Sequence, residues 1–192
     1  MLENIDKVKE YVFDFLKHGT PPHLKYHNLR HTEQVYEAGI KIAKLENISK
    51  NDMRLLETAI LFHDLGNIVQ RQGHETISTK MANNILPAFG YNNSEIEQVS
   101  GIILATEYPQ KPQSHLGEIM ADADLSLMGY NSWGKEIDGY RIELGQEDLK
   151  QWYKGQKGFL TNHNWFTNAA KTLFDKQKKE NIIYCEKQIM KL

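Results

Sequence analysis

Residues 61–66 read Leu-Phe-His-Asp-Leu-Gly, and the adjacent residues His63 and Asp64 decide how the rest of the chain is interpreted. Further residues of metal-ligating type stand before and after this stretch: His31, Asp122 and Asp124. Imidazoles and carboxylates spread over about half the chain meet only if the chain folds to bring them together. Such a mixed set suits a divalent metal ion that supports hydrolysis. The sequence therefore points to an enzyme with a metal centre.

The stretch before His63 has the spacing of a helix. Its apolar residues at helical positions are Leu55, Leu56, Ala59, Ile60 and Phe62. Neighbouring side chains on a helix diverge by about 100°, so a metal ion would lie over the helix surface between His63 and Asp64. Gly66 predicts a left-handed cap at the end of this helix. The unpaired carbonyl groups of a last turn carry partial negative charge, which favours a nearby cation.

Apolar stripes and stop signals predict helices along most of the chain. The predicted helices lie at about residues 5–18, 35–45, 55–62, 75–86, 94–106 and 116–128, with a last long one after Thr167. A loop is predicted at 107–114, which contains two prolines, and short helices with loops follow Asn131. No segment alternates between apolar and polar residues in the manner of a strand. The predicted fold class is all-α.

The 192-residue chain is long enough for one domain with a real hydrophobic core. Its formal net charge of −2 gives no reason to expect a nucleic-acid polymer or a membrane surface as partner, which leaves small molecules. Cys185 is the only cysteine, so an intramolecular disulfide and a thiolate zinc cluster are excluded, and a reducing cytoplasm is expected. Residues 1–14 show no apolar run of signal-peptide type. A homo-oligomer is left open.

The mixed ligand set describes a hydrolytic centre better than a structural one. Four protein ligands leave positions open on a six-coordinate ion, which water and a phosphoryl oxygen would fill. The candidate ions are Mn, Fe, Co, Ni, Zn and Mg. A nearby histidine or aspartate would move the protons. His27 and His31 are four residues apart, so they project from the same face if that stretch is helical, one toward the metal and one toward the substrate.

The ordered ligand set resembles the HD-domain superfamily of metal-dependent phosphohydrolases, which is named for its His-Asp doublet. The resemblance runs from about Tyr26 to Gly129, and it is carried by the intact motifs Leu-Phe-His-Asp-Leu-Gly and Ala-Asp-Ala-Asp-Leu. Residues 159–181 look like the tail of small bacterial members. The resemblance implies a helical bundle with a metal site between helices. Its implied organisation is a single domain over 1–192, with a motif core at about 26–129 and a C-terminal helical cover at 130–192.

By this resemblance the metal ligands are His31, His63, Asp64 and Asp124. Asp122 would then hold a ligand imidazole or a metal-bound water, although the residues alone leave the choice between the two late aspartates open. His27 lies in Tyr-His-Asn, an element similar to the segment of cyclic-nucleotide phosphodiesterases whose first histidine donates a proton to the leaving oxygen. It is the candidate general acid. Asp64 and Asp122 are expected to serve catalysis as well, and His74, which begins a helix, is a further candidate.

The predicted function is hydrolysis of a phosphate mono- or diester of a nucleotide or related small metabolite by a metal-activated water. Members that cleave cyclic dinucleotides usually carry a lysine after the His-Asp-x-Gly turn and a Gly-Tyr-Pro signature, whereas this chain has Asn67 and no such tripeptide. Diiron oxygenases need two more histidines, and His74 and His115 match their spacing poorly. The main alternative is a metal-containing module that senses a nucleotide without turnover.

Substrate selectivity is expected outside the motifs, in the loop 107–114 and in the region after Gly129. The aromatic residues of that region are expected to be mainly core, with a stacking platform for a nucleobase as the alternative. Three basic residues are candidates for phosphate binding, although the sequence does not show where their side chains point: Arg30, Arg71 and Lys111.

Overall fold

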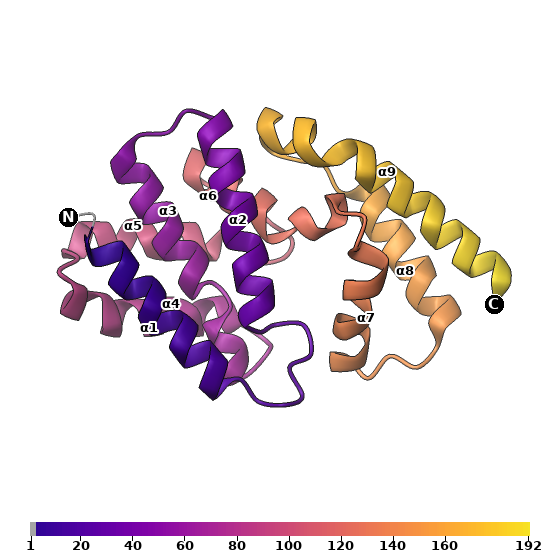
Figure 1. Cartoon of the computed structure of the whole chain (residues 1–192), viewed down its shortest axis with the longest axis horizontal. Helices are drawn as coiled ribbons and strands as arrows, with labels where there is room; N and C mark the ends of the chain where they lie inside the picture. The colour runs from indigo at the N-terminus through magenta and orange to yellow at the C-terminus, as the bar shows by residue number, and fades with distance from the viewer. Residues whose placement is uncertain (1–2) are drawn as a thin grey trace.

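The computed structural model describes residues 3–192, and within them every regular element is helical (Figure 1). The prediction of an all-α fold is confirmed. In chain order the α-helices are α1 (Glu3–Gly19), α2 (Leu29–Leu45), α3 (Lys50–Phe62), α4 (His74–Ile85), α5 (Asn93–Leu104), α6 (His115–Asp124), α7 (Trp133–Glu143), α8 (Leu149–Asn162) and α9 (Asn168–Lys191). Short 3-10 helices lie between some of them: η1 (Leu65–Ile68), η2 (Leu86–Phe89) and η3 (Ser126–Gly129). In this described part of the chain, no helix is both long and apolar enough to cross a membrane.

Helix α3 is the centre of the larger half of the fold. It packs against α1, α2, α5 and α6, and eight of its 13 residues are buried. Because α3 is covered on most sides, the residues that directly follow it also lie in the interior. His63 and Asp64 directly follow α3 and are therefore only 0% and 8% exposed.

Helix α2 begins later than the spacing of its histidines suggested. The Asn28 side chain caps the helix by accepting a hydrogen bond from the backbone N–H of Arg30 at 3.0 Å, so the first helical residue is Leu29. His27 therefore lies in the loop before the helix. His27 and His31 were expected to share a helical face only if the stretch between them is helical, and this condition is not met, so other contacts must bring His27 to the site.

The predicted helix over residues 116–128 is divided. Helix α6 ends at Asp124 because Leu125 leaves the helical region, with φ −90° and ψ 6°, and the chain continues as η3. The Asn181 side chain donates hydrogen bonds of 2.9 Å to the carbonyl groups of Met128 and Tyr130. These bonds attach the end of η3 to α9.

Helices α7, α8 and α9 surround a second hydrophobic cluster, whose buried members include Trp133, Trp152 and Leu160. The long helix α9 runs beside α8 and passes η3 (Figure 1). As predicted, Thr167 caps it by accepting a hydrogen bond from Ala170 N at 3.1 Å. The first turns of α9 also place Phe174 in the larger cluster. Helix α9 thus joins the two halves of the fold.

Candidate metal centre

The four predicted metal ligands converge from separate parts of the bundle. His31 lies in the first turn of α2, His63 and Asp64 follow α3, and Asp124 is the last residue of α6. The ligand atoms of His31, His63 and Asp124 all lie within 4.8 Å of one another. Asp64 stands beside this group of three, because its Oδ2 is 3.2 Å from His31 Nε2 and 3.3 Å from His63 Nε2. Residues separated by over 90 positions therefore meet at one point.

The distances between these atoms fit ligands of a single metal ion. Asp124 Oδ1 lies 3.5 Å from the Nε2 atoms of both His31 and His63. Atoms that bind a metal ion at about 2.1 Å are about 3.0 to 3.5 Å apart in an octahedral or tetrahedral arrangement. His63 Nε2 and Asp64 Oδ2 are moreover buried without a hydrogen-bond partner among the described residues. A nitrogen and a carboxylate oxygen orphaned side by side are well suited to a shared cation.

Neighbouring groups orient two of the candidate ligands. His63 Nδ1 lies 2.7 Å from the carbonyl oxygen of Ile60, which can only accept, so Nδ1 carries a hydrogen and Nε2 is the atom that can ligate. Asn67 Nδ2 donates to Asp64 Oδ1 at 3.1 Å, which leaves Oδ2 for the two imidazoles. Asn67 thus positions the carboxylate of the doublet.

Burial and the neighbouring charged groups shift the pKa values of this cluster in opposite directions. Burial lowers the pKa of His63, but the nearby carboxylates of Asp64 and Asp124 outweigh it and hold the pKa well above its usual value. Burial raises the pKa of Asp124, but the neighbouring imidazoles of His31 and His63 outweigh it and bring the pKa to about 2. The pKa of Asp64 also lies well below its usual value, because His63 and other neighbours outweigh burial. The carboxylates therefore stay ionised in the interior, as cation binding requires.

Glu143, at the end of α7, fixes His27 beside the cluster. One carboxylate oxygen of Glu143 accepts hydrogen bonds from the backbone N–H groups of Tyr26 at 2.9 Å and His27 at 3.2 Å, and the other pairs with His27 Nδ1. Burial raises the pKa of Glu143, but the His27 ring and the backbone N–H groups of Tyr26 and His27 together outweigh it and lower the pKa. Because an ionised carboxylate only accepts, His27 Nδ1 carries the hydrogen. Its Nε2 is then available to the cleft that His27 lines.

His74, the first residue of α4, contacts Asp64 directly. Its Nε2 lies 3.1 Å from Asp64 Oδ1, and its Nδ1 lies 2.9 Å from the carbonyl oxygen of Arg71. Gly66 permits this approach, since a Cβ at that position would lie 2.1 Å from the carbonyl oxygen of His74. Gly66 lies within η1 and has no positive φ, so the predicted left-handed cap is wrong. Glycine is needed there because the backbone of α4 packs closely against it, and not because the residue adopts a left-handed backbone conformation.

Asp122 points away from the cluster, and its expected role is corrected. Its carboxylate accepts hydrogen bonds from Phe166 N at 2.9 Å, Thr167 N at 2.8 Å and Thr167 Oγ1 at 2.7 Å. Side chains two positions apart on a helix diverge by about 200°. When Asp124 faces the histidines, Asp122 therefore faces the start of α9, which it anchors. The structure does not bring it to a ligand imidazole.

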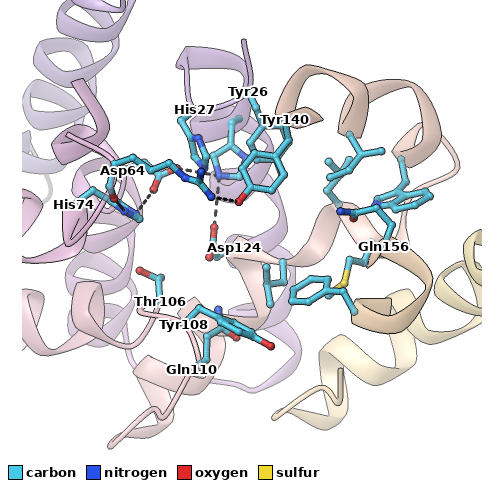
Figure 2. Close-up of a pocket in the computed structure, with 18 of the residues that line it drawn as sticks. Tyr26, His27, Asp64, His74, Thr106, Tyr108, Gln110, Asp124, Tyr140 and Gln156 are labelled. Atoms are coloured by element: carbon cyan, nitrogen blue, oxygen red, sulfur yellow. Dashed lines mark hydrogen bonds and ion pairs between the residues drawn. The ribbon is translucent and has the colours of Figure 1, made fainter. Parts of the chain in front are cut away.

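A cavity of about 550 Å³ opens over the cluster (Figure 2). Its charged and titratable lining groups include the following: His27, His31, Asp64, Arg71, His74, Glu75 and Asp124. The Tyr26 ring lies 4.7 Å from the His31 ring, and Arg71 donates a hydrogen bond of 2.9 Å to the Tyr140 hydroxyl. Apolar residues of η3, α7 and α8 line the remainder of the cavity. The cleft thus has a polar end and an apolar end.

The cleft contains residues that the sequence did not single out. Tyr108 and Gln110 come from the loop in which selectivity was expected. Tyr140 and Gln156 lie on α7 and α8, outside any motif, and Glu143 reaches the site only because α7 packs against the loop before α2. For Tyr140, Glu143 and Gln156 the one available signal was their position in the region after Gly129, and such a position does not identify single residues.

Of the three basic residues considered for phosphate binding, one lines the cavity, namely Arg71. Arg30 pairs with Glu136 at 3.2 Å and does not line the cavity, and neither does Lys111. His115 lies 3.0 Å from Glu118 and 3.5 Å from a carboxylate oxygen of Glu46. It is not among the residues that line the cavity. His74 and His115, the two histidines considered for a diiron oxygenase, therefore do not meet in the cleft.

Comparisons with known proteins agree with this architecture. The family model described as HD domain matches residues 28–128, which is more than half of the chain. No protein with a curated description matches the sequence.

Two solved structures share the fold. The crystal structure of Bacillus subtilis YpgQ in complex with ADP is 21% identical, with a TM-score of 0.71, and the match covers 100% of this chain and 96% of the other. A predicted HD superfamily hydrolase from an uncultured Thermotogales bacterium is 19% identical, with a TM-score of 0.65 and coverage of 97% and 91%. At these identities the likeness establishes the fold. Together with the match over residues 28–128, it shows that the chain belongs to the HD domain family.

Proposed function

We propose that this protein is a metal-dependent phosphohydrolase that cleaves a phosphate mono- or diester of a nucleotide or related small metabolite. The observation that carries the proposal is the pair of orphaned atoms, His63 Nε2 and Asp64 Oδ2, which lie 3.3 Å apart where a 550 Å³ cavity meets the interior. Orphaned ligand atoms beside an accessible cavity suit a metal ion that works on a bound molecule.

His31, His63, Asp64 and Asp124 would hold the ion. Two nitrogen and two oxygen ligands suit a divalent ion such as Mn, Fe, Co, Ni, Zn or Mg. When bound, such an ion supplies polarisation of the phosphoryl group and activation of water. Asn67 and the carbonyl group of Ile60 keep Asp64 and His63 aimed at the ion.

His27 supplies the proton that the leaving oxygen needs. Glu143 holds its Nδ1–H, so the imidazolium form of His27 can donate its Nε2 proton toward the cleft and become a neutral imidazole. The ring centroid of His27 lies 5.8 Å from that of His31, which places the acid next to the ligand cluster without making it a ligand. A positioned general acid accelerates such a reaction by roughly 10² to 10⁴.

His74 and Arg71 supply positive charge near the phosphate. Burial lowers the pKa of His74, but Asp64, Glu75 and the carbonyl group of Arg71 together outweigh burial and raise the pKa, which favours the charged ring. The Arg71 guanidinium lies 5.5 Å from the centre of the Tyr140 ring and donates to its hydroxyl, so its direction is fixed at the cavity wall. Cationic donors of this kind offset the charge of a phosphoryl group.

The nucleotide part of the proposal draws support from the YpgQ structure, which contains ADP. The fold of that protein matches this chain from end to end. The cavity volume of about 550 Å³ is in the range of small-molecule sites.

A hydrolysis screen tests the proposal. The protein is stripped with a chelator, reloaded with each candidate ion and incubated with nucleotides and other phosphate mono- and diesters, and the products are separated by chromatography. We expect metal-dependent hydrolysis of at least one compound and none by Asp64→Ala. If the metal-loaded protein binds a nucleotide and leaves it intact, the chain is a sensing module and the proposal is wrong.

A further inference from the structure

The apolar end of the cleft forms a distinct recess beside the metal cluster. Its apolar side chains come from the turn into η3, from η3 itself and from α7 and α8: Leu125, Leu127, Met128, Trp133, Ile137 and Phe159. We call this set, with Gly155 and Gln156 of α8, the apolar recess. All eight residues line the same cavity as His27, Asp64 and Asp124. A molecule whose phosphate lies at the cluster therefore has this recess within the same space.

The recess contains no charged side chain, and its one polar side chain is the amide of Gln156. Figure 2 shows Gln156 among apolar side chains, on the side of the cavity away from His27, Asp64 and His74. Placing an unpaired charge against such walls is costly, so the group that binds there is uncharged. An amide offers one acceptor and two donor hydrogens, which match the edge of a ring that carries neighbouring donor and acceptor atoms.

The walls favour a flat ring. Trp133 and Met128 are only 1% and 3% exposed, so they are fixed parts of the wall, and the half-buried Phe159 supplies the accessible aromatic surface. Aromatic groups and methionine sulfur make favourable contacts with flat rings.

Gly155 leaves room for that ring. It lies inside α8, where glycine costs about 0.5 to 1 kcal/mol relative to alanine. A Cβ at this position would meet no atom within 4 Å, so close packing with the protein does not explain the glycine. Because Gly155 lines the cavity, a larger side chain there would enter the space beside Gln156.

We propose that the apolar recess binds the organic group of the substrate, an uncharged aromatic heterocycle of the nucleobase kind, with the Gln156 amide reading its polar edge and Gly155 setting its permitted size. This inference rests on the proposed function for the placement of the phosphate at the metal cluster. The binding of the ring depends on the recess alone, so the two are tested separately.

The test measures equilibrium binding of nucleosides, which carry no phosphate to be hydrolysed. The as-purified protein is titrated with adenosine, guanosine, cytidine and uridine, and with ribose as the ring-free probe. We expect at least one nucleoside to bind at least 10-fold more tightly than ribose. Gly155→Leu should lower the affinity for that nucleoside at least 10-fold.

Gly158→Leu is the matched control. Gly158 lies on the same helix and its Cβ position is equally open, but it does not line the cavity. Both substitutions replace a helical glycine with a good helix former, so both variants should fold. Gly158→Leu should bind the nucleoside as the wild type does.

Gln156→Met, which keeps the length of the side chain and removes the amide, tests the polar contact. It should reduce the differences in affinity among the four nucleosides by up to about 10-fold, the value of one hydrogen bond.

Nucleoside affinity equal to that of ribose, or equal loss in the two leucine variants, would overturn the recess proposal. Nucleoside binding that follows the expected pattern, with no hydrolysis of any phosphate ester, would overturn the proposed hydrolase function and leave the recess in place. Hydrolysis confined to esters without a ring, with no nucleoside binding, would overturn the recess proposal and leave the hydrolase function in place.

Discussion

The imidazole of His27 and the carboxylate of Glu143 form a pair that joins the loop before α2 to the end of α7, across 116 positions of the sequence. Only 4% of the Glu143 side chain is exposed, and it also accepts two backbone hydrogen bonds from the same loop. The C-terminal half of the chain therefore fixes the proposed acid, whose sequence neighbours belong to the N-terminal half.

This pair predicts two graded losses of activity. His27→Ala should lower kcat by roughly 10² to 10⁴ on a substrate with a poor leaving group, and much less on a p-nitrophenyl ester, which needs no protonation. Glu143→Gln should cause a smaller loss, about 10-fold or more, because the ring is held less firmly. Metal content should be unchanged in both. If His27→Ala hydrolyses the poor-leaving-group substrate at the wild-type rate, another residue is the acid, and His74 is the next candidate.

Asp122 should matter for stability and not for metal binding. Asp122→Asn replaces one acceptor oxygen with an amide that faces donors at the start of α9, and we expect a loss of about 1 to 3 kcal/mol in the free energy of unfolding. Thr167→Ala, which removes the cap of α9, should lose about 1 kcal/mol. Denaturant unfolding measures both. An Asp122→Asn protein that is as stable as wild type but poor in metal would contradict this assignment.

His163 should make the fold less stable in mild acid. Burial and the charge of Lys178 lower the pKa of His163 to about 4, with Asp175 acting weakly in the other direction, whereas an unfolded histidine titrates near 6.5. Between these values the unfolded chain binds more protons, so stability falls as the pH falls from about 6.5 to 4. The free energy of unfolding of His163→Gln should fall less steeply over that interval. Parallel curves for the two proteins would rule out this contribution.

The two hydrophobic clusters should unfold together. Phe174 of α9 lies in the larger cluster while Cys185 of the same helix lies in the smaller one. A Cβ on Gly129 would lie 2.2 Å from the Phe174 Cβ, so Gly129→Val should loosen α9 from η3. We propose a single-domain chain, which predicts one cooperative transition for wild type by circular dichroism and by tryptophan fluorescence. Two separate transitions in the wild-type protein would contradict it.

The sequence predicted most helices and the residues of the cluster, because both depend on local patterns. The stripe through Leu55 and Ile60 reports the burial of α3, and the doublet His63 and Asp64 is contiguous. Asp122 and Asp124 could not be told apart from spacing alone, since only the packing of α9 shows that Asp122 faces the start of that helix and not the cluster. The family resemblance favoured Asp124, and Asp124 is the one in the cleft.

Residues that reach the cleft by tertiary packing had no such signal. Glu143 and Gln156 resemble ordinary polar residues of amphipathic helices, and their place in the site depends on how α7 and α8 lie against the motif helices. The place of His27 in the site has the same origin. Its four-residue spacing from His31 suggested one helix, but the Asn28 cap starts the helix later, and Glu143 brings the ring to the same place.

The most direct test of the central claim is the metal content of three purified proteins, measured by elemental analysis after identical preparation: wild type, Asp64→Ala and Asp122→Asn. Asp64 Oδ2 is an orphaned buried ligand atom, whereas the Asp122 carboxylate is occupied at the start of α9. We predict a divalent metal in wild type and in Asp122→Asn, and its loss from Asp64→Ala. Equal metal occupancy in wild type and Asp64→Ala would contradict the account.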